Sequence, residues 1–384
     1  MTSTVTRGYA IAVSIALVLP VTVAAQGYNL TVLQGLGGAA GINSINDRGW
    51  ATGVANNAAN TVSHAALWFG GPTPRDLGTL GAPDLNSAIA WPVKSNNGVV
   101  VGISDTNENN PLGEAFSCWA FFAPGAPTGK ICKGFRWEKG RMSALPAFPG
   151  GYNSYAAGAN NRGEIVGWAE NGFLDPTCDP NYQLLQFHAV IWWPNGQMQD
   201  LPPLPGDSVS AATAINDKGQ VVGISGDCGI AIGGVSAKHA VLWERGVPIN
   251  LGDLGGHSLN TPTAINNAGV IIGFSLPLDQ DGTRNYRAVV WTKESGIRKL
   301  DEPPGIVRSA AWGLNDSNQI AGVARVAGAG SFAVMWQTPV APIQNLNDLV
   351  SPGSPRLTIA GDINNDGAIA GSTADGFGFL ATPK

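Results

Sequence analysis

Short apolar runs, each ended by a turn sequence, recur seven times along the chain. The clearest copy contains the segments ATAINDKGQVVGIS, KHAVLWERG and VPINLGDLGG. In this copy an Ala-rich strand runs to Ile215, and a turn at 217–219 leads into a second strand at 220–225. Strands at 239–244 and 247–251 complete the unit. β-Branched and aromatic residues bounded by turn residues favour strands, so the pattern predicts a meander of four short strands.

The copies align on one turn residue that requires a positive φ, which Gly or Asn adopts most easily. The aligned residues are Gly49, Gly98, Gly163, Gly219, Gly269, Asn318 and Gly367. Six copies also end their third strand with a tryptophan, at Trp68, Trp137, Trp192, Trp243, Trp291 and Trp336. Leu380 takes this place in the last copy. We expect these tryptophans to be buried between units, because each buries on the order of 150–250 Å².

A four-stranded meander repeated at this period is typical of a propeller blade, with an open solenoid as the alternative. The last copy ends at Lys384 without a fourth strand, whereas residues 28–33 match a fourth strand without its first three. We therefore expect the N-terminal strand to complete the last blade and to leave no open sheet edge. The prediction for residues 26–384 is one all-β domain, a seven-bladed β-propeller of four-stranded antiparallel blades.

The repeated units resemble the bacterial extracellular HAF-repeat family. The resemblance rests on Ile-Asn-x-x-Gly-x-aliphatic-Val-Gly, His-Ala-aliphatic-Leu-Trp and Leu-Gly-x-Leu-Gly-Gly, and it covers nearly all of 26–384. It departs where Lys133, Arg287, Phe332 and Gly376 replace the histidine. The resemblance implies an exported repeat protein and brings no activity or catalytic residue with it. The period is also similar to that of kelch propellers, but the kelch pattern of Gly-Gly followed by Tyr and Trp is absent.

The first 25 residues indicate an export signal. Arg7 is followed by an apolar, uncharged stretch at 10–23, and Val23-Ala24-Ala25 provides the small residues of a cleavage site before Gln26. A membrane anchor is the alternative, but the apolar run is shorter than the roughly 18 residues that span a bilayer. We expect a secreted or periplasmic protein with no membrane span.

Four cysteines lie in insertions or loops between the repeated segments, which suits an oxidising compartment. Three pairings are open to them. We favour Cys118–Cys132 within one insertion and Cys178–Cys228 between neighbouring insertions, with free thiols as the alternative.

Composition and charge narrow the function. Charged residues make up 13% of the chain, against roughly 25% in ordinary globular proteins. The net charge is −5, and the Lys and Arg residues are scattered along the sequence. A nucleic-acid surface needs a basic patch, so we expect no nucleic-acid partner. No G-x-S-x-G, H-E-x-x-H or P-loop sequence occurs.

Two groups of residues are candidates for metal binding. Asp362, Asn364 and Asp366 precede Gly367 and match the opening of a calcium loop, although Thr373 stands where a Glu usually completes it. Calcium at this turn is one hypothesis, and an ordinary turn is the other. His64, His188 and His239 share one repeat position, but third strands of a seven-fold ring are too far apart for shared zinc ligation. A hydrogen bond or charge pair at the strand edge is the role expected of them.

Trp91 and Trp312 lie outside the aligned tryptophans, near the mouth of the predicted ring. We hypothesise that they stack on a sugar or a peptide, with packing between blades as the alternative. The sequence thus favours an exported, monomeric, non-catalytic binding or cell-surface interaction protein with a carbohydrate or protein ligand and no cofactor. The alternative is a secreted polysaccharide hydrolase or lyase, which a cluster of carboxylates around a pocket in the ring mouth would favour.

Overall fold

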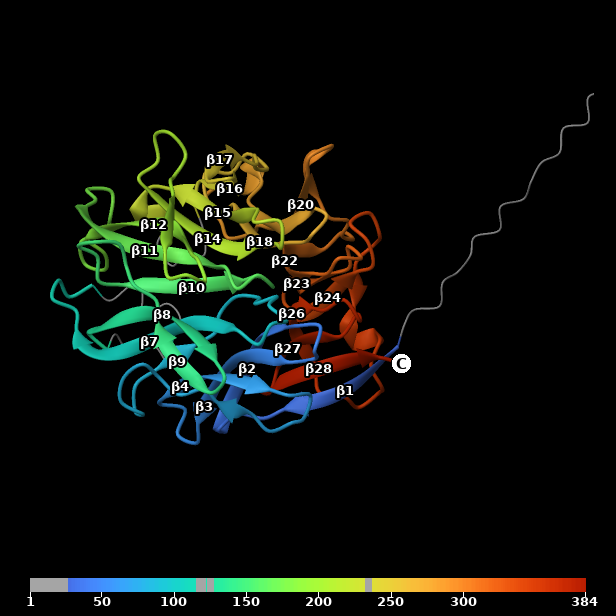
Figure 1. The fold of residues 1–384 in the computed structure, drawn as a ribbon. Helices are drawn as coiled ribbons and strands as arrows, with labels where there is room; N and C mark the ends of the chain where they lie inside the picture. The colour runs from blue at the N-terminus through green and yellow to red at the C-terminus, as the bar shows by residue number, and fades with distance from the viewer. Residues whose placement is uncertain (1–26, 115–121, 123–127, 232–236) are drawn as a thin grey trace, which may run out of the picture.

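The computed structural model describes residues 27–114, 122, 128–231 and 237–384. These residues form seven four-stranded antiparallel sheets, which follow one another around a β-propeller from blue to red in Figure 1. The predicted fold class is therefore confirmed. The predicted signal peptide, residues 1–25, lies outside the described residues.

Each blade takes four strands, and the innermost is the one that opens the repeat. Blade 1 contains β2 (Gly37–Ile45), β3 (Ala51–Asn57), β4 (Ser63–Trp68) and β5 (Arg75–Asp76). Blade 2 contains β6 (Ser87–Ala88), β7 (Val100–Asn109), β8 (Lys130–Glu138) and β9 (Arg141–Ala144). Blade 3 contains β10 (Ser154–Ala159), β11 (Ile165–Leu174), β12 (Leu185–Trp192) and β13 (Met198–Leu201). Blade 4 contains β14 (Val209–Ile215), β15 (Val221–Gly226), β16 (His239–Glu244) and β17 (Val247–Asn250). Blade 5 contains β18 (Thr261–Ile265), β19 (Ile271–Ser275), β20 (Arg287–Thr292) and β21 (Gly296–Lys299). Blade 6 contains β22 (Ile306–Leu314), β23 (Ile320–Val326), β24 (Gly330–Trp336) and β25 (Gln344–Asn345). Blade 7 contains β26 (Leu357–Ile363), β27 (Ile369–Thr373), β28 (Gly378–Pro383) and, as its fourth strand, β1 (Tyr28–Leu33).

The chain closes the ring by pairing its two ends within blade 7. β1 runs antiparallel to β28 over six residue pairs, from Tyr28 opposite Pro383 to Leu33 opposite Gly378. The side chains of Tyr28 and Leu33 are fully buried. Figure 1 shows the blue strand β1 beside the red strand β28. The predicted closure by the N-terminal strand is confirmed.

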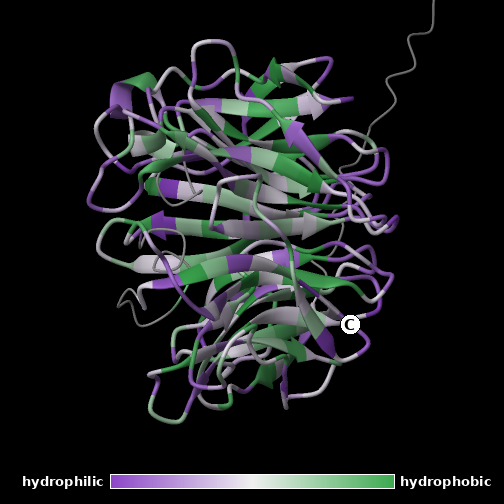
Figure 2. Cartoon of the chain, turned by 60° about the vertical axis from the view of Figure 1, so that its left-hand side comes forward, coloured by the Kyte–Doolittle hydropathy of each residue, from purple (hydrophilic) through white to green (hydrophobic). Residues whose placement is uncertain are grey.

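The aligned tryptophans lock neighbouring blades together. All six are buried, as the repeat pattern predicts. The indole N–H of five of them donates to a backbone carbonyl in the segment that precedes its own blade in the chain. The pairs are Trp68–Gln34, Trp192–Pro146, Trp243–Pro202, Trp291–Gly252 and Trp336–Asp301. Figure 2 shows hydrophobic residues along the strands and hydrophilic ones in many of the connecting loops. The repeat therefore specifies both the strands and the contact between blades.

Little helix accompanies the strands. The helical segments among the described residues are short: α2 (Cys228–Ala231), η1 (Leu278–Gln280) and η2 (Leu346–Asp348). Among the described residues, no helix has the length and apolar character that crossing a membrane requires. Cys178 and Cys228 form the predicted disulfide between the third and fourth blades. The second predicted pair involves Cys118, which lies outside the described residues.

Candidate functional site

The axial channel has two mouths, and the first turn of each blade surrounds one of them. At this turn-side mouth an asparagine amide of each blade donates to a backbone carbonyl of the next blade, in the pairs Asn46–Ser95, Asn97–Asn160, Asn160–Asn216, Asn216–Asn266, Asn266–Asn315, Asn315–Asn364 and Asn364–Asn46. Ser95 replaces the asparagine in blade 2, and Asn97 supplies the amide there instead. We call this closed circle the amide ring.

A second circle lies beside the amide ring. It consists of Asp47, Asn96, Asn161, Asp217, Asn267, Asp316 and Asn365, and each backbone N–H donates to the side-chain oxygen of the next member. Every aspartate stands between two asparagines, whose amide groups donate to its second oxygen. The three carboxylates thus act as hydrogen-bond acceptors that join blades, and no two of them are neighbours.

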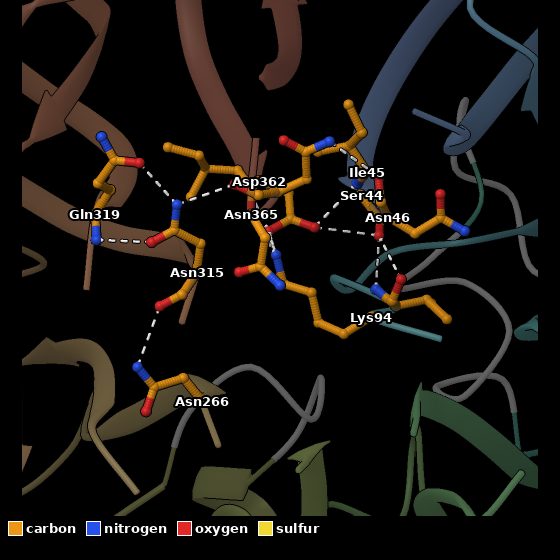
Figure 3. A network of polar contacts seen from close by, with 12 residues as sticks. Ser44, Ile45, Asn46, Lys94, Asn266, Asn315, Gln319, Asp362 and Asn365 are labelled. Atoms are coloured by element: carbon orange, nitrogen blue, oxygen red, sulfur yellow. Dashed lines mark hydrogen bonds and ion pairs between the residues drawn. The ribbon is translucent and has the colours of Figure 1, made fainter. Parts of the chain in front are cut away.

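Below these circles an ion pair crosses the channel. The Lys94 ammonium of blade 2 contacts the fully buried Asp362 carboxylate of blade 7 (Figure 3). The other Asp362 oxygen accepts the backbone N–H of Ile45 at 3.0 Å and the hydroxyl of Ser44 at 3.3 Å. Burial raises the pKa of Asp362, and Lys94 opposes that rise. The cavity here measures about 60 Å³.

The three residues of the calcium hypothesis occupy different surroundings at this mouth. Asp362 faces Lys94, Asn364 belongs to the amide ring, and Asp366 is exposed at the tip of the turn. The side-chain oxygen of Asn364 already accepts the backbone N–H of Ala368 at 2.8 Å. Calcium binding at this turn stays a prediction.

The opposite mouth, on the side of the long loops between second and third strands, opens into a larger cavity of about 250 Å³. First strands or the segments next to them from four blades line it, through Asn43, Pro92, Trp312 and Gly361. The volume lies near the lower end of ordinary ligand pockets, which span about 300–1,000 Å³. We call it the loop-side cavity.

The structure brings Trp91 and Trp312 together at this mouth. Their ring centroids lie 5.7 Å apart, although they belong to blades 2 and 6. Trp91 is buried in a core cluster, whereas Trp312 is half-buried and lines the cavity. Phe274 lies 5.7 Å from Trp312 and 4.5 Å from Tyr286, so an aromatic array extends from the axis to the cavity rim. Trp91 is the buried member of the array, and Trp312 is the member that lines the cavity.

Two arginines in the cavity wall were not predicted from the sequence, along which basic residues are scattered. Arg308 on β22 and Arg325 on β23 are direct cross-strand partners. The Arg308 guanidinium lies 5.5 Å from the ring centroid of Tyr286. Among the described residues, neither arginine forms an ion pair with a carboxylate. The usable sequence signal is their position in one hairpin, although a bulge beside Arg308 shifts the register.

Each repeat-position histidine lies within hydrogen-bonding distance of a different aspartate, so the three do not meet at one site. The pairs are His64–Asp76 at 2.9 Å, His188–Asp200 at 3.0 Å and His239–Asp207 at 2.8 Å. The hydrogen bond to Asp76 raises the pKa of His64. Burial alone would raise the pKa of Asp76, but hydrogen bonds from His64 and from the Gly78 N–H outweigh it, so that pKa is lowered.

A buried carboxylate pair lies between blades 2 and 3. The Gln183 amide donates to Glu170 at 2.9 Å and to Glu114 at 3.4 Å. Burial raises the pKa of Glu170, and the neighbouring Glu114 adds to that rise. Burial also lowers the pKa of nearby Lys133. Neither glutamate lines the loop-side cavity.

Comparison with known proteins gives a likeness of fold. No family model and no curated protein matches the sequence. Among solved structures, the chain is similar to virginiamycin B lyase from Staphylococcus aureus, with 13% identity over 93% of this chain and 100% of the lyase, and a TM-score of 0.49. It is similar to an ulvan lyase, a polysaccharide lyase, with 11% identity over 93% and 94% of the two chains and a TM-score of 0.41. It is also similar to a puromycin-hydrolyzing peptidase from Mycobacterium tuberculosis, with 14% identity over 78% and 44% and a TM-score of 0.45. Similarities at this level carry no argument about activity.

Proposed function

We propose that the protein is an exported, non-catalytic carbohydrate-binding propeller whose ligand occupies the loop-side cavity. The observation that carries the proposal is the half-buried face of Trp312 in a cavity that also offers the polar side chains of Asn43 and Ser331. Sugar rings stack on aromatic faces while neighbouring polar groups bond their hydroxyls. The Cys178–Cys228 disulfide suits an oxidising, extracytoplasmic compartment, as does the resemblance to HAF-repeat proteins.

The enzyme alternative would need carboxylates positioned around an accessible pocket. The loop-side cavity is lined by no Asp or Glu among the described residues. Carboxylates do surround the turn-side mouth, at Asp47, Asp217 and Asp316, but their oxygens accept hydrogen bonds from neighbouring blades around a cavity of about 60 Å³. These observations favour binding over hydrolysis or elimination.

A glycan array followed by fluorescence titration tests the proposal. We expect wild-type protein to retain at least one class of polysaccharide and Trp312→Ala to lose at least tenfold in affinity, while its melting profile still shows a cooperative fold. Trp50→Ala is the matched control, because Trp50 packs edge-on against Phe69 outside the loop-side cavity. Equal loss in both variants, or no binding by wild type, would count against the proposal.

A further inference from the structure

The cross-strand arginine pair is unfavourable for folding on its own. Arg308 and Arg325 stand directly opposite each other on β22 and β23, and like charges in that relation destabilise a sheet. Several other described cations do pair with an acid, as Arg162 does with Glu164 and Arg287 with Glu302. No described carboxylate compensates Arg308 or Arg325. The repulsion between the two guanidinium groups is therefore not offset by any described negative charge.

An aromatic contact holds one of these cations, Arg308, at the cavity. Tyr286 packs against Phe274 and presents its ring to the Arg308 guanidinium at 5.5 Å, which restrains that side chain. A third guanidinium lies at the rim, because Arg356 donates to the backbone carbonyl of the cavity residue Ser331 at 3.0 Å. The chain as a whole carries a net charge of −5, so this concentration of arginines is local.

We infer that the loop-side cavity binds an acidic saccharide, whose sugar ring lies against Trp312 and whose carboxylate or sulfate group lies between Arg308 and Arg325. Guanidinium groups present paired N–H donors that match the oxygens of either anion. The absence of carboxylates from the described cavity wall leaves nothing there to repel such a ligand. This inference rests on the proposed carbohydrate-binding function and names its ligand class.

The test compares matched charged and neutral ligands by isothermal titration calorimetry on the folded protein. One arm uses tetragalacturonate and its methyl ester, and the other uses a sulfated galactan tetrasaccharide and its desulfated form. We expect at least one charged ligand to bind about tenfold or more tightly than its neutral partner, with an affinity that falls as salt rises. The arm that responds identifies carboxylate or sulfate as the anion.

Arg308→Gln and Arg325→Gln should lose the preference and bind both forms as weakly as wild type binds the neutral one. Arg141→Gln is the control, because Arg141 is exposed on β9 and does not line the loop-side cavity. Either cavity variant should melt at the wild-type temperature or above it, because a like-charge pair has been removed. A purely structural role for the arginines would instead lower the melting temperature and leave the ligand preference intact.

The failures of the two proposals are distinguishable. Equal binding of charged and neutral forms, unchanged in Arg308→Gln, would overturn the acidic-ligand inference and leave carbohydrate binding standing. No binding of any saccharide in either arm or on the array would overturn both.

Discussion

The Lys94 ammonium pairs with the buried Asp362 carboxylate from two blades away, with Ser44 and Ile45 of blade 1 between them. Each residue is an exception in its own column of the repeat. Lys94 stands where Ile45 and Ile215 stand in other copies, and Asp362 stands where the other copies have small or apolar residues, such as Ala214. The two exceptions compensate each other at the axis.

Removing only the cation should therefore be costly. Lys94→Met leaves the Asp362 charge buried and unpaired, and we expect a loss of about 3 kcal/mol in the free energy of unfolding. Lys94→Ile combined with Asp362→Ala restores residues used in other copies, so it should lie within about 1 kcal/mol of wild type. Urea denaturation measures both, with Lys139→Met as a control because its side chain is 89% exposed. A double variant as unstable as Lys94→Met would contradict the compensation.

The loss in Lys94→Met should also shrink in acid. The pKa of Asp362 in the folded protein lies above its ordinary value of 3.8, because burial disfavours the charge. The folded state therefore binds that proton more tightly than the unfolded chain, and lowering the pH toward 4 favours folding at this site. Without Lys94 the effect should be larger. A stability difference between wild type and Lys94→Met that stays constant from pH 7 to pH 4 would argue against this assignment.

The closing strand gives a second prediction. Leu33 is fully buried where β1 meets β28, so Leu33→Ala should destabilise the protein by about 2–5 kcal/mol. Thr31→Ala, on the exposed face of the same strand, should change stability by no more than about 0.5 kcal/mol. Deleting residues 27–33 should expose an edge of blade 7 and abolish cooperative unfolding. An unchanged thermal transition in the deletion variant would rule out closure by this strand.

The amide ring gives a third. Asn315 donates to the Asn364 carbonyl at 2.9 Å and accepts the backbone N–H groups of Ser317 and Gln319. Asn315→Ala removes these three hydrogen bonds, and we expect a loss of about 1–3 kcal/mol. Asn195 makes similar contacts within one exposed turn but joins no blades. Denaturation should show a small effect for Asn195→Ala, and equal effects would mean that the circle between blades adds nothing.

The His64–Asp76 pair should make stability depend on pH. The pKa of His64 is raised, so its contribution is complete below about pH 6.5 and is lost as the pH rises through the raised value. The pKa of Asp76 is lowered, so its contribution is present above pH 3.8 and is lost in stronger acid. Asp76→Asn should thus cost about 0.2–1 kcal/mol near pH 5–6 and less at higher pH. Thermal melts across this range, with exposed Asp375→Asn as control, check the profile, and a difference that grows above pH 7 would refute it.

The sequence carried most of the fold because each repeat encodes its own turn and its own contact to the next blade. Gly219 and Asn318 have φ values of 77° and 62° at equivalent turns, as their positions predict. Trp91 and Trp312 were singled out because both lie outside the aligned tryptophans and close to the predicted ring mouth, and in the structure their rings lie 5.7 Å apart. These inferences need only local pattern and the geometry of a ring.

Contacts that cross the ring were out of reach. Lys94 and Asp362 lie 268 residues apart, and neither residue alone indicates the other. The bulges in β22 shift the register that sets Arg308 opposite Arg325, so counting from the turn does not by itself pair them. The hypothesis of acidic residues in the ring mouth anticipated carboxylates near the axis. The asparagines that surround Asp47, Asp217 and Asp316 at the turn-side mouth come from neighbouring blades, so the sequence around each aspartate does not indicate them.

A crystal structure of the protein with the tightest-binding acidic oligosaccharide tests the central claim most directly. We predict a sugar ring against Trp312, with its anionic group within hydrogen-bonding distance of Arg308 or Arg325. An ordered saccharide at the turn-side mouth, or in a groove between blades with the loop-side cavity empty, would contradict the account.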